Sequence, residues 1–270
     1  MRVLTLNLWQ EQGPWAERLD LVAERLPSLD ADVICLQEVR HVPGRVPNQA
    51  ETLAAKLGYA CAFEPAQPWG GGDEGLAILS RHPIVERRCC DLPRPPHRER
   101  RICLGAAIAC PEALTWVFTT HLTFRLEDGA IREQQVRAVD TFVRSRGDAA
   151  QTVAVLAGDF NATPEADEMR YLRGLTSIEG ERTYYQDAFA LCNPGVEKAT
   201  WAKENPYTAQ LGWLAPGRRL DYVFVTPERA NGAGRILGSQ VVLDAPDARG
   251  VWCSDHYGVL ADLQVNPSRT

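Results

Sequence analysis

The chain has 270 residues, of which 45% are hydrophobic, 24% charged and 8% aromatic, as in an ordinary globular protein. This composition excludes a disordered or collagen-like chain, and the length allows one large domain or two small ones. There are 35 acidic residues against 29 lysines and arginines, which gives a formal net charge of −6. The chain therefore has no overall basic field for tight binding to a long polyanion.

The first 60 residues predict two strands, each followed by a helix. Residues 3–8 alternate like a strand, and Pro14 suits the first position of a helix whose apolar residues recur at steps of three and four. Residues 33–39 are the second expected strand. Asn48 begins a capping-box pattern that opens the second helix, and Gly58 ends that helix.

The rest of the chain adds more strands than helices. One helix is expected over about residues 129–144, and a shorter one opens with Thr163 as its N-cap, followed by Pro164. Strands are expected over 75–80, 101–109, 115–122, 152–157, 220–226, 237–243 and 257–265. Two packed sheets covered by helices accommodate this order. Since no linker or shift in composition interrupts it, we expect one domain over 1–265 and a tail at 266–270.

The eight cysteines indicate a reduced protein rather than a disulfide framework. They are dispersed without any C-x-x-C pair, and several, such as Cys35 and Cys103, lie in apolar runs. No stretch resembles a signal peptide or reaches the ~20 apolar residues of a membrane span. We therefore expect a cytoplasmic protein without a transmembrane segment.

Acids, amides and histidines stand at the ends of the predicted strands. These residues are Asn7, Glu38, His121, Asp159, Asn161, Asp221, Asp255 and His256. Brought to one rim by the sheets, they would suit a hard cation and acid–base chemistry. Each of them alone is also consistent with a solvated strand end or a turn cap. Because Asp255 and His256 diverge in extended chain, the carboxylate that orients His256 must come from elsewhere, and Asp221 is the best candidate.

An ordered set of motifs resembles the endonuclease/exonuclease/phosphatase superfamily, of the deoxyribonuclease I-like type. The motifs are Leu4-Thr5-Leu6-Asn7, Leu36-Gln37-Glu38-Val39, the segment 75–81, Thr120-His121-Leu122, Gly158-Asp159-Phe160-Asn161, Arg219-Leu220-Asp221-Tyr222 and Ser254-Asp255-His256. The resemblance runs from about residue 1 to residue 265. It implies a four-layer α/β/β/α sandwich, in which two packed mixed β-sheets are flanked by helices, and a metal-dependent hydrolase acting on phosphate ester bonds.

The resemblance also implies a metal site. Glu38 corresponds to the main metal ligand, Asn7 lies beside it, and Asp255 is a further carboxylate at the metal. The implied cation is Mg²⁺, with Mn²⁺ or Ca²⁺ as alternatives. A cation of this kind would supply the positive charge that the acidic composition lacks.

The remaining motif residues correspond to groups that act on the substrate. His256 corresponds to the general base and Asp221 to the residue that orients it. Asp159 would align the attacking water, and Asn161 and His121 would donate to the phosphoryl oxygens. Phosphoryl transfer needs in-line positioning and charge neutralisation, which these residue types provide.

Residues between the motifs are candidates for substrate binding. Arg101 ends the basic cluster at 94–101. This cluster is consistent either with a solvated loop or with a loop that supplies one phosphate-binding arginine. Trp69 and Trp213 lie in loops where an aromatic ring either stacks on a substrate or packs beneath the loop. Glu74 either pairs with His121 or is an exposed loop acid.

The acidic composition bears on the substrate. It favours a small phosphodiester or a short nucleic acid, and we do not expect tight binding to long duplex DNA. A sphingomyelinase-like phospholipid substrate, or a sugar or inositol phosphate, is the alternative. A non-catalytic binding protein on the same fold is a further alternative, disfavoured because the family positions all match. The pattern specifies no oligomeric state.

Overall fold

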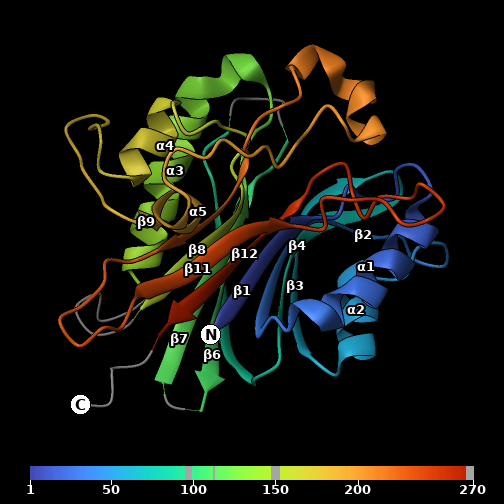
Figure 1. The fold of residues 1–270 in the computed structure, drawn as a ribbon, viewed down its shortest axis with the longest axis horizontal. Coiled ribbons are helices and arrows are strands. Elements are labelled where there is room, and N and C mark those ends of the chain that lie inside the picture. The colour runs from blue at the N-terminus through green and yellow to red at the C-terminus, as the bar shows by residue number, and fades with distance from the viewer. Residues whose placement is uncertain (95–98, 112, 147–152, 266–270) are drawn as a thin grey trace.

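The computed structural model describes residues 1–94, 99–111, 113–146 and 153–265. Two six-stranded sheets pack face to face, and helices cover the outer face of each sheet (Figure 1). This is the expected four-layer α/β/β/α sandwich, so the predicted fold class is confirmed. The predicted tail at 266–270, the start of the expected strand at 152 and part of the basic cluster, 95–98, lie outside the described residues.

The first sheet has the strand order β11-β12-β1-β2-β4-β3. Its strands are β1 (Arg2–Asn7), β2 (Val33–His41), β3 (Ala60–Trp69), β4 (Gly72–Ser80), β11 (Arg235–Val242) and β12 (Gly258–Gln264). Strand β1 pairs in parallel with β2 and in antiparallel with β12. The ends of β1 and β2 and the start of β12 therefore lie at the same edge of the sheet.

The second sheet has the strand order β5-β6-β7-β8-β10-β9. Its strands are β5 (Ile84–Asp91), β6 (Ile102–Cys110), β7 (Ala113–His121), β8 (Ala154–Asp159), β9 (Gln186–Asp187) and β10 (Asp221–Val225). Strand β8 is parallel to β7 and antiparallel to β10. The ends of β7 and β8 thus meet the start of β10.

Helices α1 and α2 cover the first sheet, and α3 and α4 cover the second (Figure 1). The helices are α1 (Trp15–Leu29), α2 (Gln49–Leu57), α3 (Gly129–Arg144), α4 (Asp167–Leu172), α5 (Ala188–Cys192) and the 3-10 helices η1 (Leu126–Asp128) and η2 (Pro206–Leu214). Asn48 caps α2 as predicted, accepting from two backbone N–H groups, and Gly58 ends that helix with a φ of 70°. Pro14 is the N-cap of α1 rather than its first residue.

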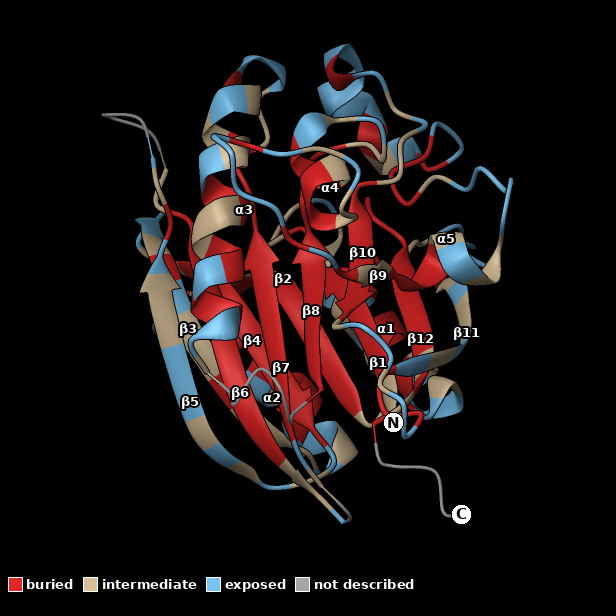
Figure 2. Ribbon diagram, turned by 90° about the vertical axis from the view of Figure 1, so that its left-hand side faces the viewer, coloured by how far each residue is buried: buried red, intermediate tan, exposed pale blue. Residues whose placement is uncertain are grey.

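The buried residues form layers that match the sandwich (Figure 2). Between the sheets, Val3 and Ile78 from one sheet meet Leu104 and Val155 from the other. All six residues of β8 are buried, since the first sheet covers one face and helices cover the other. This double burial explains why the sequence of β8 is a continuous apolar run rather than an alternating one.

Some elements differ from the sequence prediction. Strands β3 and β5 were not predicted, because β3 contains prolines and β5 carries charged side chains. Both are edge strands, where proline is tolerated and polar residues meet solvent. The prediction of Thr163 as a helix N-cap was wrong: α4 begins at Asp167, after a turn in which the Ala166 N–H donates to the Thr163 carbonyl at 3.0 Å.

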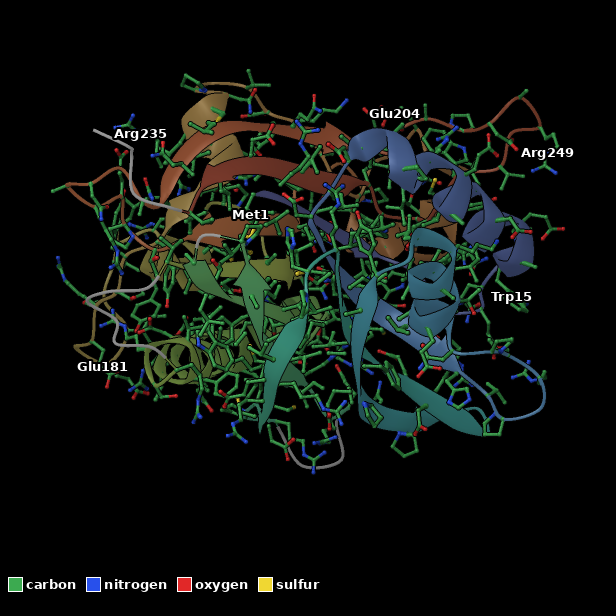
Figure 3. All side chains as sticks on the ribbon, turned by 90° about the horizontal axis from the view of Figure 1, so that it is seen from below. Met1, Trp15, Glu181, Glu204, Arg235 and Arg249 are labelled. Atoms are coloured by element: carbon green, nitrogen blue, oxygen red, sulfur yellow. The ribbon has the colours of Figure 1, made fainter. Side chains whose placement is uncertain are left out.

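Met1 marks the end of the sandwich opposite the polar strand ends. Figure 3 views the molecule from below and shows Met1 at this end. Its amino group donates to the Leu263 carbonyl at 2.7 Å, and its side chain packs against the core between the sheets. In the described ranges, no helix combines the length and apolar character needed to cross a membrane.

Candidate active site

The sheet topology brings four polar strand ends together. Asn7 ends β1, and its side-chain amide donates to Asp159 Oδ2 at 3.1 Å, at the end of β8 in the other sheet. His121 ends β7 in register with Asp159, and Asp221 opens β10 in register with the same residue. The expected gathering of these side chains at one rim is therefore present.

Glu38 reaches this rim through a bulge in β2. The register between β2 and β4 shifts at this point, and Glu38 has a left-handed φ of 52°. A non-glycine residue in this region costs about 1–3 kcal/mol, and such residues concentrate at functional sites. Glu38 Oε1 accepts from Asn7 Nδ2 at 3.1 Å, while Asn7 Oδ1 accepts from the Trp9 N–H at 2.9 Å. Asn7 thus presents its nitrogen, not its oxygen, to Glu38.

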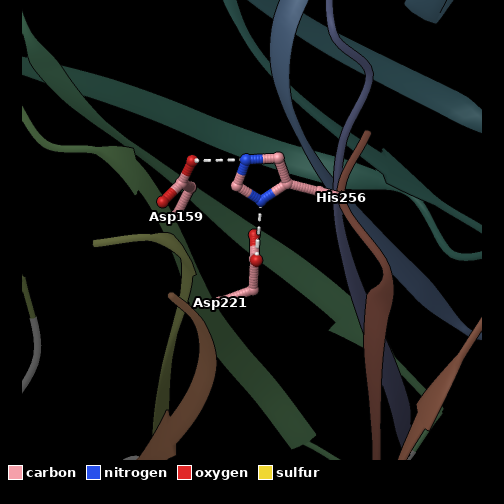
Figure 4. Close-up of side chains that lie close together, drawn as sticks. All are labelled: Asp159, Asp221 and His256. Atoms are coloured by element: carbon pink, nitrogen blue, oxygen red, sulfur yellow. Dashed lines mark hydrogen bonds and ion pairs between the residues drawn. The ribbon is translucent and has the colours of Figure 1, made fainter. Parts of the chain in front are cut away.

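His256 lies between two carboxylates (Figure 4). Its Nδ1 is 2.8 Å from Asp221 Oδ2, and its Nε2 is 3.7 Å from Asp159 Oδ2. Asp255 turns away from the imidazole, and its Oδ2 accepts from Trp201 Nε1 at 3.2 Å. The contact that the sequence predicted between His256 and Asp221, rather than the adjacent Asp255, is present.

The carboxylates determine the charge of this site. Burial alone would lower the pKa of His256, but Asp221, Asp159 and Asp255 outweigh burial and raise this pKa well above its ordinary value. Burial, with repulsion from neighbouring carboxylates, raises the pKa of Glu38 to about 8 and that of Asp159 to about 6. These shifts describe a buried acidic cluster that is short of positive charge.

Arg101 lies between Glu74 and His121. Its Nη1 is 2.7 Å from His121 Nδ1 and 3.8 Å from Glu74 Oε1. The direct pair of Glu74 with His121, which the sequence left open, is replaced by this arrangement. Burial, followed by the charges of Arg101 and His256, lowers the pKa of His121 well below its ordinary value, so its imidazole is neutral.

Of these residues, all but Asn7 and Asp221 line one pocket of about 450 Å³. Aromatic and amide side chains in its wall are Trp9, Gln10, Gln12, Gln67, Trp69, Phe124, Asn161, Trp201, Tyr207 and Gln210. Trp69 is 43% exposed, and the Arg40 guanidinium stacks on its ring at 5.0 Å. Trp213 is 59% exposed on η2 and is not among the residues of this wall. Of the two tryptophans proposed for substrate binding, the fold thus brings only Trp69 to the pocket.

The pocket has the donor set of a hard divalent cation. Within the described ranges, one atom each from Asp159, Asp221 and His256 lie within 4.8 Å of one another. Asp221 Oδ1 is buried without a hydrogen-bond partner, and Glu38 and Asp255 add two carboxylates to the wall. Oxygen-rich, acidic sets of this kind suit Mg²⁺, Mn²⁺ and Ca²⁺.

Of three further residues in the pocket wall, one was predicted from the sequence and two were not. Asn161 has a left-handed φ of 51°, and its side-chain amide donates to the Leu122 carbonyl at 3.0 Å. Arg218 and Trp201 also line the pocket, and the sequence reasoning missed both. The sequence offered a signal for Arg218, because this residue lies three positions before Asp221, which stands at the start of a predicted strand. No motif marked Trp201.

Solved structures share this fold over nearly the whole chain. The human Nocturnin catalytic domain with bound sulfate anion aligns with a TM-score of 0.73 at 21% identity, covering 97% of this chain and 93% of that one. An endonuclease/exonuclease/phosphatase from Bacteroides vulgatus aligns at 0.74 and 20% identity, covering 98% of both. A humanized D. rerio TDP2 aligns at 0.74 and 17% identity, covering 97% of both. At these identities, the likeness concerns the fold alone.

The sequence comparisons identify the family. Nocturnin of Drosophila melanogaster is 25% identical over an alignment of 296 residues, gaps included, that covers 96% of this chain and 43% of that protein. Human Nocturnin is 24% identical over an alignment of 170 residues that covers 58% of this chain and 38% of that protein, so the chain spans less than half the length of these relatives. The model of the Endonuclease/Exonuclease/phosphatase family, whose members are hydrolases of phosphate esters, matches residues 4–256. Since this match covers nearly the whole chain, the protein belongs to the Endonuclease/Exonuclease/phosphatase family.

Proposed function

We propose that this protein hydrolyses the phosphodiester bond of a small substrate or a short nucleic acid, with the help of a divalent cation. The observation that carries the proposal is the His256 imidazole, held between Asp221 and Asp159 at the wall of a pocket that also contains Glu38. In-line transfer of a phosphoryl group to water needs a base, fixed donors and charge neutralisation at one site.

His256 is the proposed general base. Its Nδ1 is occupied by Asp221, so Nε2 is the atom that would take the proton of the attacking water. Asp159, 3.7 Å from Nε2, would align that water. Asp221 keeps the imidazole in the tautomer and orientation that this proton transfer needs.

Glu38 is the proposed main ligand of the cation, with Asp255 in the same wall. Asn7 would act through its hydrogen bonds to Glu38 and Asp159, which hold these two carboxylates in position. A divalent cation bound here would neutralise charge on the phosphate and weaken the negative field that keeps His256 protonated. The raised pKa of Glu38, about 8, supports this role because it reports a buried carboxylate without a compensating charge.

His121 and Asn161 are the proposed donors to the phosphoryl oxygens. Because a guanidinium can only donate, Arg101 makes Nδ1 of His121 an acceptor and leaves the proton on Nε2. That Nε2 lies 3.5 Å from Asp159 Oδ2, next to the proposed position of the water. The human Nocturnin catalytic domain, which shares this fold, was solved with a bound sulfate anion, a tetrahedral oxyanion like phosphate.

The size and charge of the molecule support a small substrate. A pocket of about 450 Å³ accommodates a small phosphodiester, and the net charge of −6 disfavours tight binding to long duplex DNA. The proposed compartment is the cytoplasm, since all eight cysteines are free thiols.

A substrate panel tests this function. Bis-p-nitrophenyl phosphate, p-nitrophenyl phosphate and short DNA are each assayed with magnesium, manganese or calcium, and with a chelator as the blank. We expect cation-dependent turnover that is greatest for a diester and is lost in a folded His256→Ala variant. Absence of turnover on every substrate would favour the non-catalytic alternative, whereas full activity of His256→Ala would overturn the role of His256 as the general base.

A further inference from the structure

Arg218 is a pocket arginine that forms no ion pair within the described part of the chain. Its side chain lines the pocket, and its Nε is buried without a hydrogen-bond partner. The guanidinium lies over the ring of Trp201, 5.4 Å from the ring centroid. A partly buried guanidinium without a carboxylate partner is costly, so such a residue indicates a site for an anion.

The backbone fixes this arginine beside the reaction centre. Arg218 and Trp201 pair as an isolated antiparallel bridge, in which each residue's N–H donates to the other's carbonyl at 3.0–3.1 Å. Trp201 in turn donates its indole N–H to Asp255 at 3.2 Å, and its ring lies 6.3 Å from that of His256. The guanidinium therefore rests on a rigid aromatic surface that belongs to the same wall as the proposed general base.

The other arginine of this wall is already engaged. Arg101 contacts His121 at 2.7 Å and has Glu99 and Glu74 within 3.6 and 3.8 Å. Arg218 has no such partner: burial lowers the pKa of its guanidinium, and the charge of Asp159 offsets this only in part. A substrate phosphate that enters this acidic pocket thus finds Arg218 as its free guanidinium among the described wall residues.

We propose that Arg218 binds a non-bridging oxygen of the phosphate group that is hydrolysed. This inference rests on the proposed function and assigns a substrate-binding residue to it. The guanidinium would donate charge-assisted hydrogen bonds to the phosphate while remaining stacked on Trp201. Because the contact is made with the reacting phosphate, it serves monoester and diester substrates alike.

Kinetics of an Arg218→Gln variant test this contact. We expect kcat/KM to fall about 10- to 100-fold for both p-nitrophenyl phosphate and its bis ester, the range for loss of a charge-assisted hydrogen bond. Arg218→Lys should recover part of the loss, since it keeps the charge but not the planar fork. Arg146→Gln is the matched control, because Arg146 also stacks on an aromatic ring but lies outside the pocket wall. Unchanged kcat/KM in Arg218→Gln overturns the proposal.

Binding of orthophosphate gives a measurement that does not require turnover. Calorimetry in the presence of magnesium should show about 10-fold or greater weakening in Arg218→Gln, with wild-type affinity in Arg146→Gln. Equal affinity of Arg218→Gln and the wild type, or no binding to either, overturns the proposal. If the wild type binds orthophosphate through Arg218 but hydrolyses no substrate of the panel, the proposed function fails while the anion site stands.

Discussion

The guanidinium of Arg101 holds Nδ1 of His121 at 2.7 Å, inside the protein and at the edge of the pocket. Both side chains are buried, and a guanidinium has no acceptor atom. The proton of the neutral imidazole must therefore be on Nε2, the atom nearer to Asp159 and Glu38. Arg101 is thus a positioning residue that leaves His121 with a hydrogen-bond donor on the side of Asp159 and Glu38.

This relationship predicts the tautomer of His121. In ¹⁵N-labelled protein, we expect the Nδ1 resonance of His121 to be that of an unprotonated ring nitrogen and Nε2 to carry the proton. Arg101→Lys should preserve this pattern, because an ammonium also only donates, whereas Arg101→Met should remove the preference. A proton found on Nδ1 of the wild type would contradict this interpretation of the contact.

Asp221→Asn tests the orientation of His256. We expect an intact fold and a kcat lowered about 10²- to 10⁴-fold, because a neutral amide neither stabilises the imidazolium nor selects its tautomer. The double variant with His256→Ala should be no slower than His256→Ala alone, since the two residues act as a unit. Asp262→Asn, which removes a half-exposed partner of Arg2, is the control. If the losses of kcat in the two single variants instead added up in the double variant, Asp221 and His256 would act independently.

Glu38→Gln tests the cation site. The amide keeps the acceptor for Asn7 but removes a buried negative charge, so we expect magnesium affinity to fall at least about 10-fold in calorimetry. In a chelator, its melting temperature should equal or exceed that of the wild type, because the charge is costly without a cation. The exposed Glu24→Gln is the control. Unchanged affinity would assign the cation to Asp159, Asp221 and His256 instead.

Gly158→Ala tests the close approach of β7 and β8. A Cβ at this position would lie 2.1 Å from the Thr120 carbonyl oxygen, so the two backbones would have to separate. We expect the free energy of unfolding in urea to fall by about 3 kcal/mol. In Gly212→Ala the added Cβ meets no atom within 4 Å, and its effect should stay within about 0.5 kcal/mol. Equal effects of the two substitutions would refute the steric argument.

Buried thiols predict a loss of stability at alkaline pH. Burial raises the pKa of Cys35 to about 12 and that of Cys253 to about 11, from an ordinary value of 9.0. The folded protein then keeps protons that the unfolded chain releases, so this contribution is full below pH 9 and is lost as the pH rises through 11 and 12. The urea midpoint in reducing buffer should fall above pH 9, and less steeply in a Cys35→Ala, Cys253→Ser variant. If the urea midpoint fell equally steeply with pH in the wild type and in the variant, these thiols would be excluded as the cause.

Local patterns were sufficient for much of the fold and for the identity of the site residues. Apolar periodicity predicted the buried strands and the long helices, and Asn48 and Gly58 marked the limits of α2, because caps and core faces depend on neighbouring residues. The pairing of His256 with Asp221 was also predictable, since adjacent side chains in extended chain diverge.

The sequence by itself determined the sandwich and the set of acids, amides and histidines at its rim, because strand ends and motif order are encoded in consecutive residues. Only the tertiary structure decided how the rim works. The bulge that aims Glu38, the insertion of Arg101 between Glu74 and His121, and the stacking of Arg218 on Trp201 join residues far apart in the chain. Such contacts depend on strand register and loop packing, which no local pattern specifies.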